Sequence, residues 1–316
     1  MKRFKNILVY LPGQIGDEQA LCRATELAQA NGAHLTLLDV VVPTNGNSGS
    51  PFIPPSAEKV DFDDDRVAER LALLKRIAAS HEAGAGETRA QVAKGRPFIE
   101  IVRTVLSGEH DLVIMAADSL QGVRLISLGA TSMHLMRKCP CPVWVIKPSR
   151  APRFKNVLAA IDASDTDPQA RALNTKILQL GSSIARQEQC NFHISYAWRL
   201  SGSDAENVKS EISDSQMDDI YKRNYRENKA LVLKALEGIE LGNVEPSIHL
   251  PDGDPAAVIP TVAQENEIDL VVMGSVSRSG ISGLLMGNTA ELVLRQVNCS
   301  VLTAKPDGFE TPITLE

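Results

Sequence analysis

Short apolar runs alternate with segments of helical spacing along the first half of the chain. The apolar runs are Ile7–Leu11, Leu35–Val42, Arg89–Val92, Leu112–Met115 and Val143–Ile146. Between the second and third runs, apolar side chains recur at helical spacing at Val67, Leu71, Leu74 and Ile77. Runs that are apolar throughout and separated by helices are typical of parallel strands with helices on both faces of the sheet. The pattern therefore predicts an α/β fold with five parallel strands.

The second half of the chain repeats this plan. Its apolar runs are Val157–Ile161, Phe192–Ala197, Ser247–Leu250, Leu270–Met273 and Val301–Ala304. The amino-acid sequence is repeated as well. Arg3–Leu8 recurs with one substitution as Arg153–Leu158, and Asp111–Met115 recurs with one substitution as Asp269–Met273. A repeat of about 150 residues is too long for a solenoid and indicates a duplicated domain.

We therefore predict two tandem, doubly wound α/β domains, each with a five-stranded parallel sheet flanked by helices. The first domain is expected over residues 1–149 and the second over residues 150–309. The remaining residues, 310–316, are expected to form a C-terminal tail.

Composition narrows the class of protein. The chain has 316 residues, of which 43% are apolar and 23% charged, and its formal net charge is −6. The apolar fraction suffices for a packed core, and the acidic balance disfavours general binding to nucleic acid or to an anionic membrane. No stretch approaches the ~20 apolar residues of a membrane span, and the first apolar run is too short for a signal peptide. We expect a soluble, cytoplasmic protein.

Polar and glycine residues follow the strands at which a ligand would bind. In an open parallel sheet, ligands bind beyond the carboxyl ends of the strands, where the strand order reverses. In the second half, Asp162 follows the first strand, Met273 and Gly274 end the fourth, and the last helix begins at Gly287-Asn288-Thr289. Asp162 can accept hydrogen bonds from a ribose or a base edge, and the helix start offers free N–H donors to a phosphate.

These motifs resemble those of the universal stress protein family, in its tandem two-domain (E-type) form. The resemblance is carried by Asp162-x-Ser164, by Gly253-Asp254-Pro255, and by the stretch Gly274-x2-Ser277-x9-Gly287-Asn288-Thr289-Ala290-Glu291. Nucleotide-binding members show G-x2-G-x9-G-[S/T]; here the second glycine is replaced by Ser277 and the last residue by Asn288. The resemblance covers nearly the whole chain and implies a HUP-like, adenine-nucleotide-binding fold in both halves.

The resemblance also implies which residues hold a nucleotide. Adenine and ribose would lie near Asp162 and Ala197, at the ends of the first two strands of the second half. The phosphates of ATP or another adenine nucleotide, with Mg²⁺, would lie against Met273, Gly274, Ser277, Gly287, Asn288 and Thr289. An alternative stays open, in which the glycines only shape tight turns between strands and helices.

The first half departs further from the family pattern. Pro12 stands in the position of Asp162, Ala116 in that of Gly274, and Ala130 in that of Asn288. Pro12 offers no side-chain acceptor, and the methyl group of Ala116 narrows the approach to the backbone. We expect no ATP in this half, and the lost polar groups suggest a small, more apolar ligand instead.

Three functions are compatible with these residues. The first is a non-catalytic stress-response protein that binds an adenine nucleotide in its second half. The second is a slow ATP hydrolase, and the third is a scaffold with two vestigial sites that acts through protein partners. The chain has no G-x-x-x-x-G-K-[ST], G-x-S-x-G or H-E-x-x-H motif. Its six histidines are scattered and Cys139-x-Cys141 is interpreted as packing, so no catalytic residue and no metal ligand is assigned.

The resemblance has consequences for assembly and physiology. Single-domain members of the family commonly dimerise, so the two halves are expected to pair as an intramolecular pseudo-dimer. Candidate contacts are the last strands, Pro142–Ile146 and Val301–Ala304, because an uncovered edge strand needs a partner. A homodimer of the whole chain is compatible with this. The family is also linked to survival of starvation, oxidants and DNA damage, without indicating which stress applies here.

Overall fold

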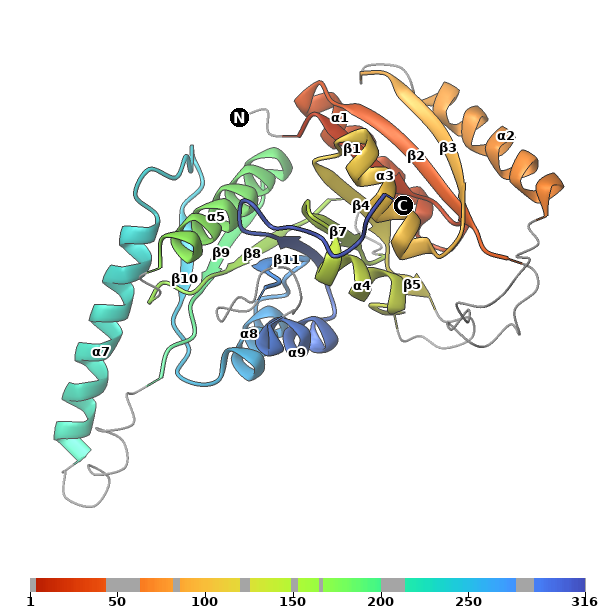
Figure 1. Ribbon diagram of the computed structural model, residues 1–316. Coiled ribbons are helices and arrows are strands. Elements are labelled where there is room, and N and C mark those ends of the chain that lie inside the picture. Colours follow the sequence, from red (N-terminus) through yellow and green to blue (C-terminus); the bar gives the residue numbers. More distant parts are fainter. Residues whose placement is uncertain are drawn as a thin grey trace. The chain divides into compact units, whose positions relative to one another are not determined.

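The computed structural model describes residues 4–43, 63–81, 86–119, 126–148, 153–164, 167–199, 214–276 and 287–315 (Figure 1). The chain divides into two compact units, Met1–Pro148 with Glu310–Glu316, and Ser149–Phe309. Residues 310–316, predicted as a separate tail, thus group with the first unit. There Arg103 Nε donates a hydrogen bond to the carbonyl of Thr314 at 3.1 Å.

The first unit alternates strands and helices. Its elements are β1 (Asn6–Tyr10), α1 (Asp17–Asn31), β2 (His34–Val41), α2 (Asp64–Ser80), β3 (Thr88–Lys94), α3 (Pro97–Gly108), β4 (Leu112–Ala116), β5 (Asp118–Ser119), β6 (Ile126–Ser127), α4 (Ala130–Lys138) and β7 (Val143–Ile146). The long strands are parallel, in the order β3-β2-β1-β4-β7, and β5 pairs with β6 in antiparallel fashion. Right-handed crossovers place α1 and α2 on one face of the sheet and α3 and α4 on the other, and Figure 1 shows the sheet between α2 and α3.

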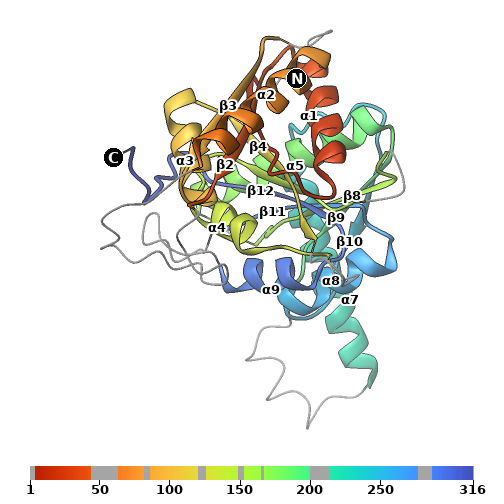
Figure 2. The ribbon, with the colours of Figure 1, turned by 90° about the vertical axis from the view of Figure 1, so that its right-hand side faces the viewer.

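The second unit has the same plan. Its elements are β8 (Asn156–Ala160), α5 (Pro168–Glu188), β9 (Asn191–Ser195), α7 (Asp214–Ala235), β10 (Pro246–His249), α8 (Pro255–Glu265), β11 (Leu270–Gly274), α9 (Asn288–Gln296) and β12 (Ser300–Ala304). The strands are parallel, in the order β10-β9-β8-β11-β12. Helices α8 and α9 lie next to each other (Figure 2). The two tandem, doubly wound, five-stranded parallel sheets predicted from the sequence are confirmed.

Burial along the strands follows their place in each sheet. Strand β4 is buried at every residue and β1 at every residue after Asn6, since both lie in the middle of the sheet with helices on both faces. Strand β3 lies at the edge, and its burial pattern is irregular with three exposed positions. The run Arg89–Val92, expected to be apolar throughout, therefore belongs to a longer strand that is partly exposed to solvent.

Three aspartates determine where helices begin. Asp63, Asp167 and Asp254 each precede a helix, and each carboxylate accepts a hydrogen bond from a backbone N–H of the first turn. Such caps satisfy donors that have no partner inside the helix. The Gly253-Asp254-Pro255 motif thus has a structural role here, because Asp254 caps α8 and Pro255 is its first residue.

One glycine sets how closely α5 packs on the sheet. Gly181 is buried in α5, and a Cβ atom added there would lie 2.7 Å from Cε2 of Phe192 in β9. We expect Gly181→Ala to lower the free energy of unfolding by about 1–2 kcal/mol, because overpacking outweighs the gain in helix propensity. Urea unfolding measures the change, with the exposed Gln187→Ala in the same helix as control. A Gly181→Ala protein as stable as the wild type would contradict this packing.

Candidate functional site

The strand order of the second unit reverses between β8 and β11, which pair side by side. Asp162 follows β8, and Met273 lies opposite Ala160 in the β8–β11 register. Ala197 follows β9, whose last residue, Ser195, accepts a hydrogen bond from the N–H of Ile161 at 3.0 Å. Predicted site residues from three distant segments thus lie at the carboxyl ends of neighbouring strands.

The turn after β8 orients Asp162. Its Oδ1 accepts hydrogen bonds from the backbone N–H of Ser164 at 3.2 Å and from the Ser164 hydroxyl at 2.7 Å. The amide of Asn174 in α5 bonds both backbone groups of Asp162, accepting from its N–H at 3.2 Å and donating to its carbonyl at 2.6 Å. Asn174 is buried. Side chains of the chain itself therefore hold the carboxylate in position.

Met273 and Gly274 belong to the packed end of β11. Met273 is buried among the strands, where it pairs with Thr303 of β12 on its other side. A Cβ atom at Gly274 would lie 3.0 Å from Cδ2 of Leu173 in α5. Close packing against α5 therefore favours a glycine here, whether or not a phosphate approaches it.

The start of α9 is tied to the end of β11. Gly287 is the N-cap of the helix, and its N–H donates to the carbonyl of Ser275 at 3.2 Å. Asn288 and Thr289, in the first turn, are exposed. The first N–H groups of a helix have no partner within it and carry the positive end of its dipole, which suits an anion. Ser277 lies outside the described residues.

The segment around Ala197 is held by backbone bonds to the chain after β10. The N–H of Tyr196 donates to the carbonyl of His249 at 3.1 Å, and that of Trp198 to the carbonyl of Pro251 at 3.1 Å. The Trp198 indole donates to the carbonyl of Leu250 at 2.9 Å. Ala197 itself is half-buried.

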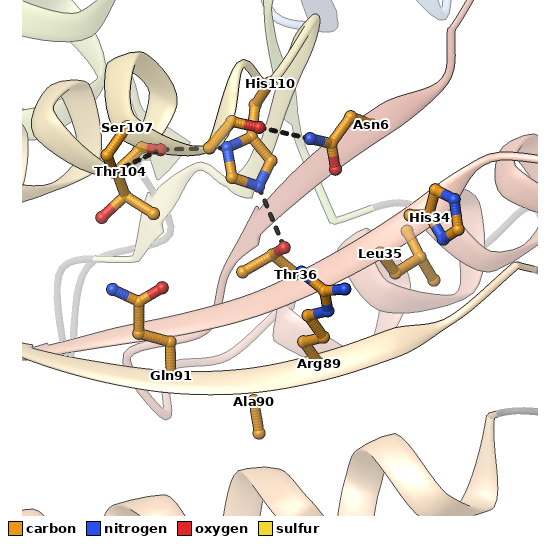
Figure 3. A pocket seen from close by; sticks show the side chains of 11 residues that line it. Asn6, His34, Leu35, Thr36, Arg89, Ala90, Gln91, Thr104, Ser107 and His110 are labelled. Atoms are coloured by element: carbon orange, nitrogen blue, oxygen red, sulfur yellow. Dashed lines mark hydrogen bonds between the residues drawn. The ribbon is translucent and has the colours of Figure 1, made fainter.

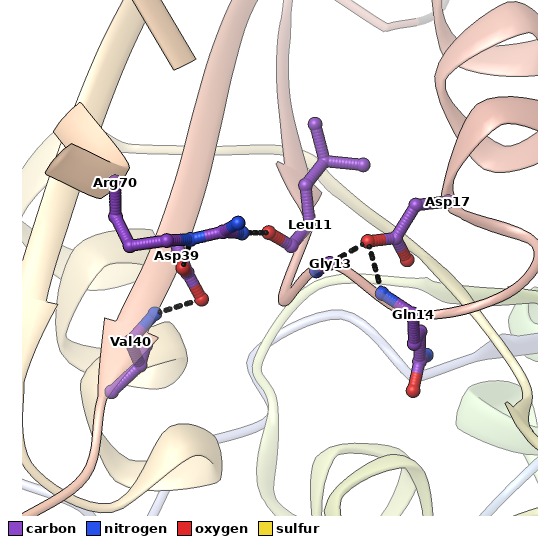
Figure 4. A network of polar contacts seen from close by, with 7 residues as sticks. All are labelled: Leu11, Gly13, Gln14, Asp17, Asp39, Val40 and Arg70. Atoms are coloured by element: carbon purple, nitrogen blue, oxygen red, sulfur yellow. Dashed lines mark hydrogen bonds and ion pairs between the residues drawn. The ribbon is translucent and has the colours of Figure 1, made fainter. Parts of the chain in front are cut away.

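In the first unit, protein side chains bridge the corresponding strand ends (Figure 4). Arg70 of α2 pairs with Asp39 of β2 at 2.5 Å between Nε and Oδ2, and donates to the carbonyl of Leu11 at 2.9 Å. Gln14 Nε2 donates to the carbonyl of Ala116, at the end of β4, at 3.2 Å. Groups that a nucleotide would contact at this edge are bound to the protein itself.

Sequence reasoning missed Asp39, Arg70, Gln14 and Asn174. Asp39 had a signal, because a carboxylate inside the apolar run Leu35–Val42 is costly to bury without a cation. Its side chain is 6% exposed, and that of Arg70 is 19% exposed. The interpretation that this end of the first half lacks polar groups is therefore incomplete. It holds an ion pair between a buried carboxylate and a half-buried arginine, where the second unit has the aspartate that follows β8.

Within the described ranges, no cluster of three or more histidine, cysteine, aspartate or glutamate side chains is arranged to hold a metal ion. No helix in the described part of the chain is long and apolar enough to cross a membrane. Cys139 and Cys141 are buried free thiols whose Sγ atoms lie 3.5 Å apart. The hydrogen bond from Cys139 and the burial of the site raise the pKa of Cys141 well above its usual value, which keeps the thiol protonated.

The chain matches the model of the universal stress protein family over residues 3–147 and 153–305. It is 30% identical to Universal stress protein E of Escherichia coli strain K12, over 100% of this chain and 98% of that protein. A Universal stress protein E homolog of Haemophilus influenzae is 24% identical over 96% of this chain and 98% of its own length.

Solved structures share the fold. A functionally unknown protein of Pseudomonas aeruginosa PAO1 matches with a TM-score of 0.72 and 24% identity, over 98% of this chain and 95% of its own. A universal stress protein of Archaeoglobus fulgidus matches with a TM-score of 0.60 and 17% identity, over 95% of this chain and 98% of its own. These similarities extend over both units.

Asp17, at the start of α1, has a pKa raised by burial. Its Oδ2 accepts hydrogen bonds from the N–H groups of Gly13 at 2.7 Å and Gln14 at 3.0 Å (Figure 4). These bonds favour the charged form, but desolvation is the larger effect and raises the pKa from 3.8 to about 6. The folded protein therefore binds more protons than the unfolded chain between these two pH values.

This shift predicts a pH dependence of stability. A raised carboxylate pKa contributes stability that is present below pH 4 and is lost as the pH rises through about 6. Relative to Asp17→Asn, which cannot titrate, the wild type should lose about 1 kcal/mol of unfolding free energy between pH 5 and 7.5. Urea unfolding at both pH values measures it. Glu18→Gln, the exposed neighbour, is the matched control, and the same change in both variants would exclude Asp17 as its source.

Proposed function

The chain belongs to the universal stress protein family, and on that premise we propose that it is a non-catalytic stress-response protein whose second unit binds an adenine nucleotide. One observation carries the proposal. The Asp162 carboxylate and the N-terminus of α9 both lie at the edge where the strand order reverses, because Asp162 follows β8 and Gly287 is bonded to Ser275 beyond β11. A hydroxyl acceptor and an anion site at one edge of a parallel sheet match the two ends of a nucleotide.

The nucleotide would contact the second unit through three groups. Asp162 would accept a hydrogen bond from a ribose hydroxyl or the base edge, and the small side chain of Ala197 would leave room for the adenine beside β9. The N–H groups at the start of α9, with Asn288 and Thr289, would bind the phosphates. Ser277 is expected to add a hydroxyl there.

The residues fit a nucleotide better than they fit a hydrolase. ATP would bring Mg²⁺ to balance its phosphates, and oxygen ligands are what Mg²⁺ prefers. We place Asp162 at the ribose or base end of the nucleotide, and its Oδ1 already accepts two hydrogen bonds from Ser164, so no side chain is assigned to the ion. No general base is assigned at this edge. The side chains therefore support binding of the nucleotide and not its turnover.

For the first unit we propose no nucleotide. Arg70 and Gln14 already bond the carbonyl groups of Leu11 and Ala116 at the corresponding edge. The small, more apolar ligand suggested by the sequence would have to lie beside the Asp39–Arg70 ion pair, which argues against it at this edge.

Assembly and physiology follow the family in this proposal. The pseudo-dimer of the two halves and a homodimer of the whole chain stay predictions. So do the cytoplasmic location and a role in resistance to DNA damage.

Calorimetry with ATP tests the proposed site. We expect Gly287→Gln to weaken ATP binding at least tenfold, because a long side chain would cover the N–H groups at the start of α9, and Asp162→Ala to weaken it by loss of an acceptor. Gly129→Gln is the matched control, since Gly129 is the N-cap of α4 in the first unit, and it should bind ATP as the wild type does. Circular dichroism melting shows that each variant is folded.

Phosphate release with Mg²⁺ separates the three functions. Binding without release supports the proposal, and release that is lost in Gly287→Gln supports the slow hydrolase. No affinity for ATP or AMP would reject the nucleotide site and leave the scaffold. Affinity that is equal in the wild type and both second-unit variants would place the nucleotide elsewhere.

A further inference from the structure

The first unit holds a pocket with several hydrogen-bonding side chains at the amino ends of its strands, away from the carboxyl ends at which nucleotide sites are sought. The pocket has a volume of about 440 Å³ and lies between the last turn of α3 and the sheet (Figure 3). Residues of the sheet and residues at and after the end of α3 line it, among them Thr36, Arg89, Gln91, Ser107 and His110. This volume lies within the range of pockets that hold small molecules.

Register explains why this face of the sheet is polar. Thr36 of β2 lies opposite Arg89 of β3, and Leu38 lies opposite Gln91, so Arg89 and Gln91 are on the same face as Thr36. Figure 3 shows both side chains extending toward α3, while Ala90 points to the other face. The hollow between the end of α3 and this face of the sheet is lined by hydrogen-bonding side chains together with apolar atoms.

His110, which follows α3, is held by hydrogen bonds on both ring nitrogens. Its Nδ1 lies 3.0 Å from the carbonyl of Thr104, and its Nε2 lies 2.9 Å from Oγ1 of Thr36. A carbonyl only accepts, so Nδ1 carries the proton and Nε2 accepts from the Thr36 hydroxyl. Burial lowers the pKa of His110, which favours this neutral form. Thr36 Oγ1 is thereby left as an acceptor toward the pocket.

The charges around the pocket favour an anion. Among the eleven lining residues Arg89 carries a positive charge, and none of them carries a carboxylate. Glu87 Oε2, outside the pocket, holds one nitrogen of the Arg89 guanidinium at 2.6 Å, and the remaining donors of this side chain can serve a ligand. His34 Nδ1 accepts a hydrogen bond from the N–H of Glu87 at 3.1 Å, so a neutral His34 carries its proton on Nε2 and is a second donor.

The second unit fills the same positions differently. The strand registers and the repeat place His193 where the first unit has Thr36, His249 where it has Gln91, and Glu265 where it has Ser107. His193 Nδ1 and His249 Nε2 are hydrogen-bonded at 2.9 Å, so two imidazoles join across β9 and β10. The residues of the second unit therefore indicate which substitutions in the first unit would fill the pocket.

We propose that this pocket binds a small anionic molecule that carries hydroxyl groups, of the sugar phosphate or sugar acid class. The anionic group lies against Arg89 and His34, and the hydroxyl groups bond to Gln91 and to Thr36 Oγ1. This site is independent of the proposed nucleotide site, because all of its residues belong to the first unit.

Titration calorimetry with glucose 6-phosphate and with gluconate tests the proposal, with inorganic phosphate as a third probe. The wild type should bind at least one of the two hydroxylated probes, and the preferred probe identifies the anionic group. Arg89→Met should weaken that binding at least tenfold. Thr36→His combined with Gln91→His, which copies the second unit, should abolish it.

Ser107→Glu is the variant that keeps the test decisive if the double variant does not fold. Ser107 is exposed at the end of α3, and the substitution copies Glu265 and adds a negative charge at the pocket. It should weaken binding of the anionic probe at least tenfold and leave any ATP affinity of the second unit unchanged. Binding of neither hydroxylated probe overturns the proposal. So does binding that persists in Ser107→Glu and Arg89→Met, or inorganic phosphate bound as tightly as the better probe.

Discussion

Each unit depends on a central strand, β1 in the first and β8 in the second, that is buried at every residue after its first. Such a strand places its backbone groups in the middle of a sheet, and those just beyond its carboxyl end must still be satisfied. The two units solve this differently. Arg70 bonds the carbonyl after β1, whereas Asn174 bonds both backbone groups of Asp162 after β8. The corresponding residue of the first unit is Pro12, which has no side-chain acceptor.

The elements follow from the sequence because they rest on local periodicity. Continuous apolar runs separated by helical spacing indicate buried parallel strands, and the repeat indicates that the fold occurs twice. The edge strand β3 was harder to predict than the central strands, because its side chains alternate between the face of the pocket and the face covered by α2. The position of Asp162 beyond β8 followed from the run Val157–Ile161, whose end is close to that of the strand.

The candidate site was less predictable because its contacts join residues that are distant in sequence. Nothing local to Asp39 names Arg70 as its partner, although a buried carboxylate demands a cation or several donors. Gly274 shows the opposite difficulty. Its motif suggests close approach of a phosphate, yet a side chain there would also press on Leu173 of α5. A glycine motif alone does not distinguish helix packing from ligand binding.

Because the domain is duplicated, each unit can be compared with the other at both ends of its strands. The two units differ at the carboxyl ends and at the amino ends. At the carboxyl ends of the strands, the first unit has closed the edge with the Asp39–Arg70 ion pair, while the second has Asp162 after β8. At the amino ends the pattern reverses, because imidazoles meet across β9 and β10 while β2 and β3 face a hollow. The buried residues of the central strands Asn6–Tyr10 and Asn156–Ala160 stay apolar in both copies, although three of the five positions differ. The polar positions at the two ends of the strands do not have to stay apolar, and the side chains of the two copies differ most in chemistry there.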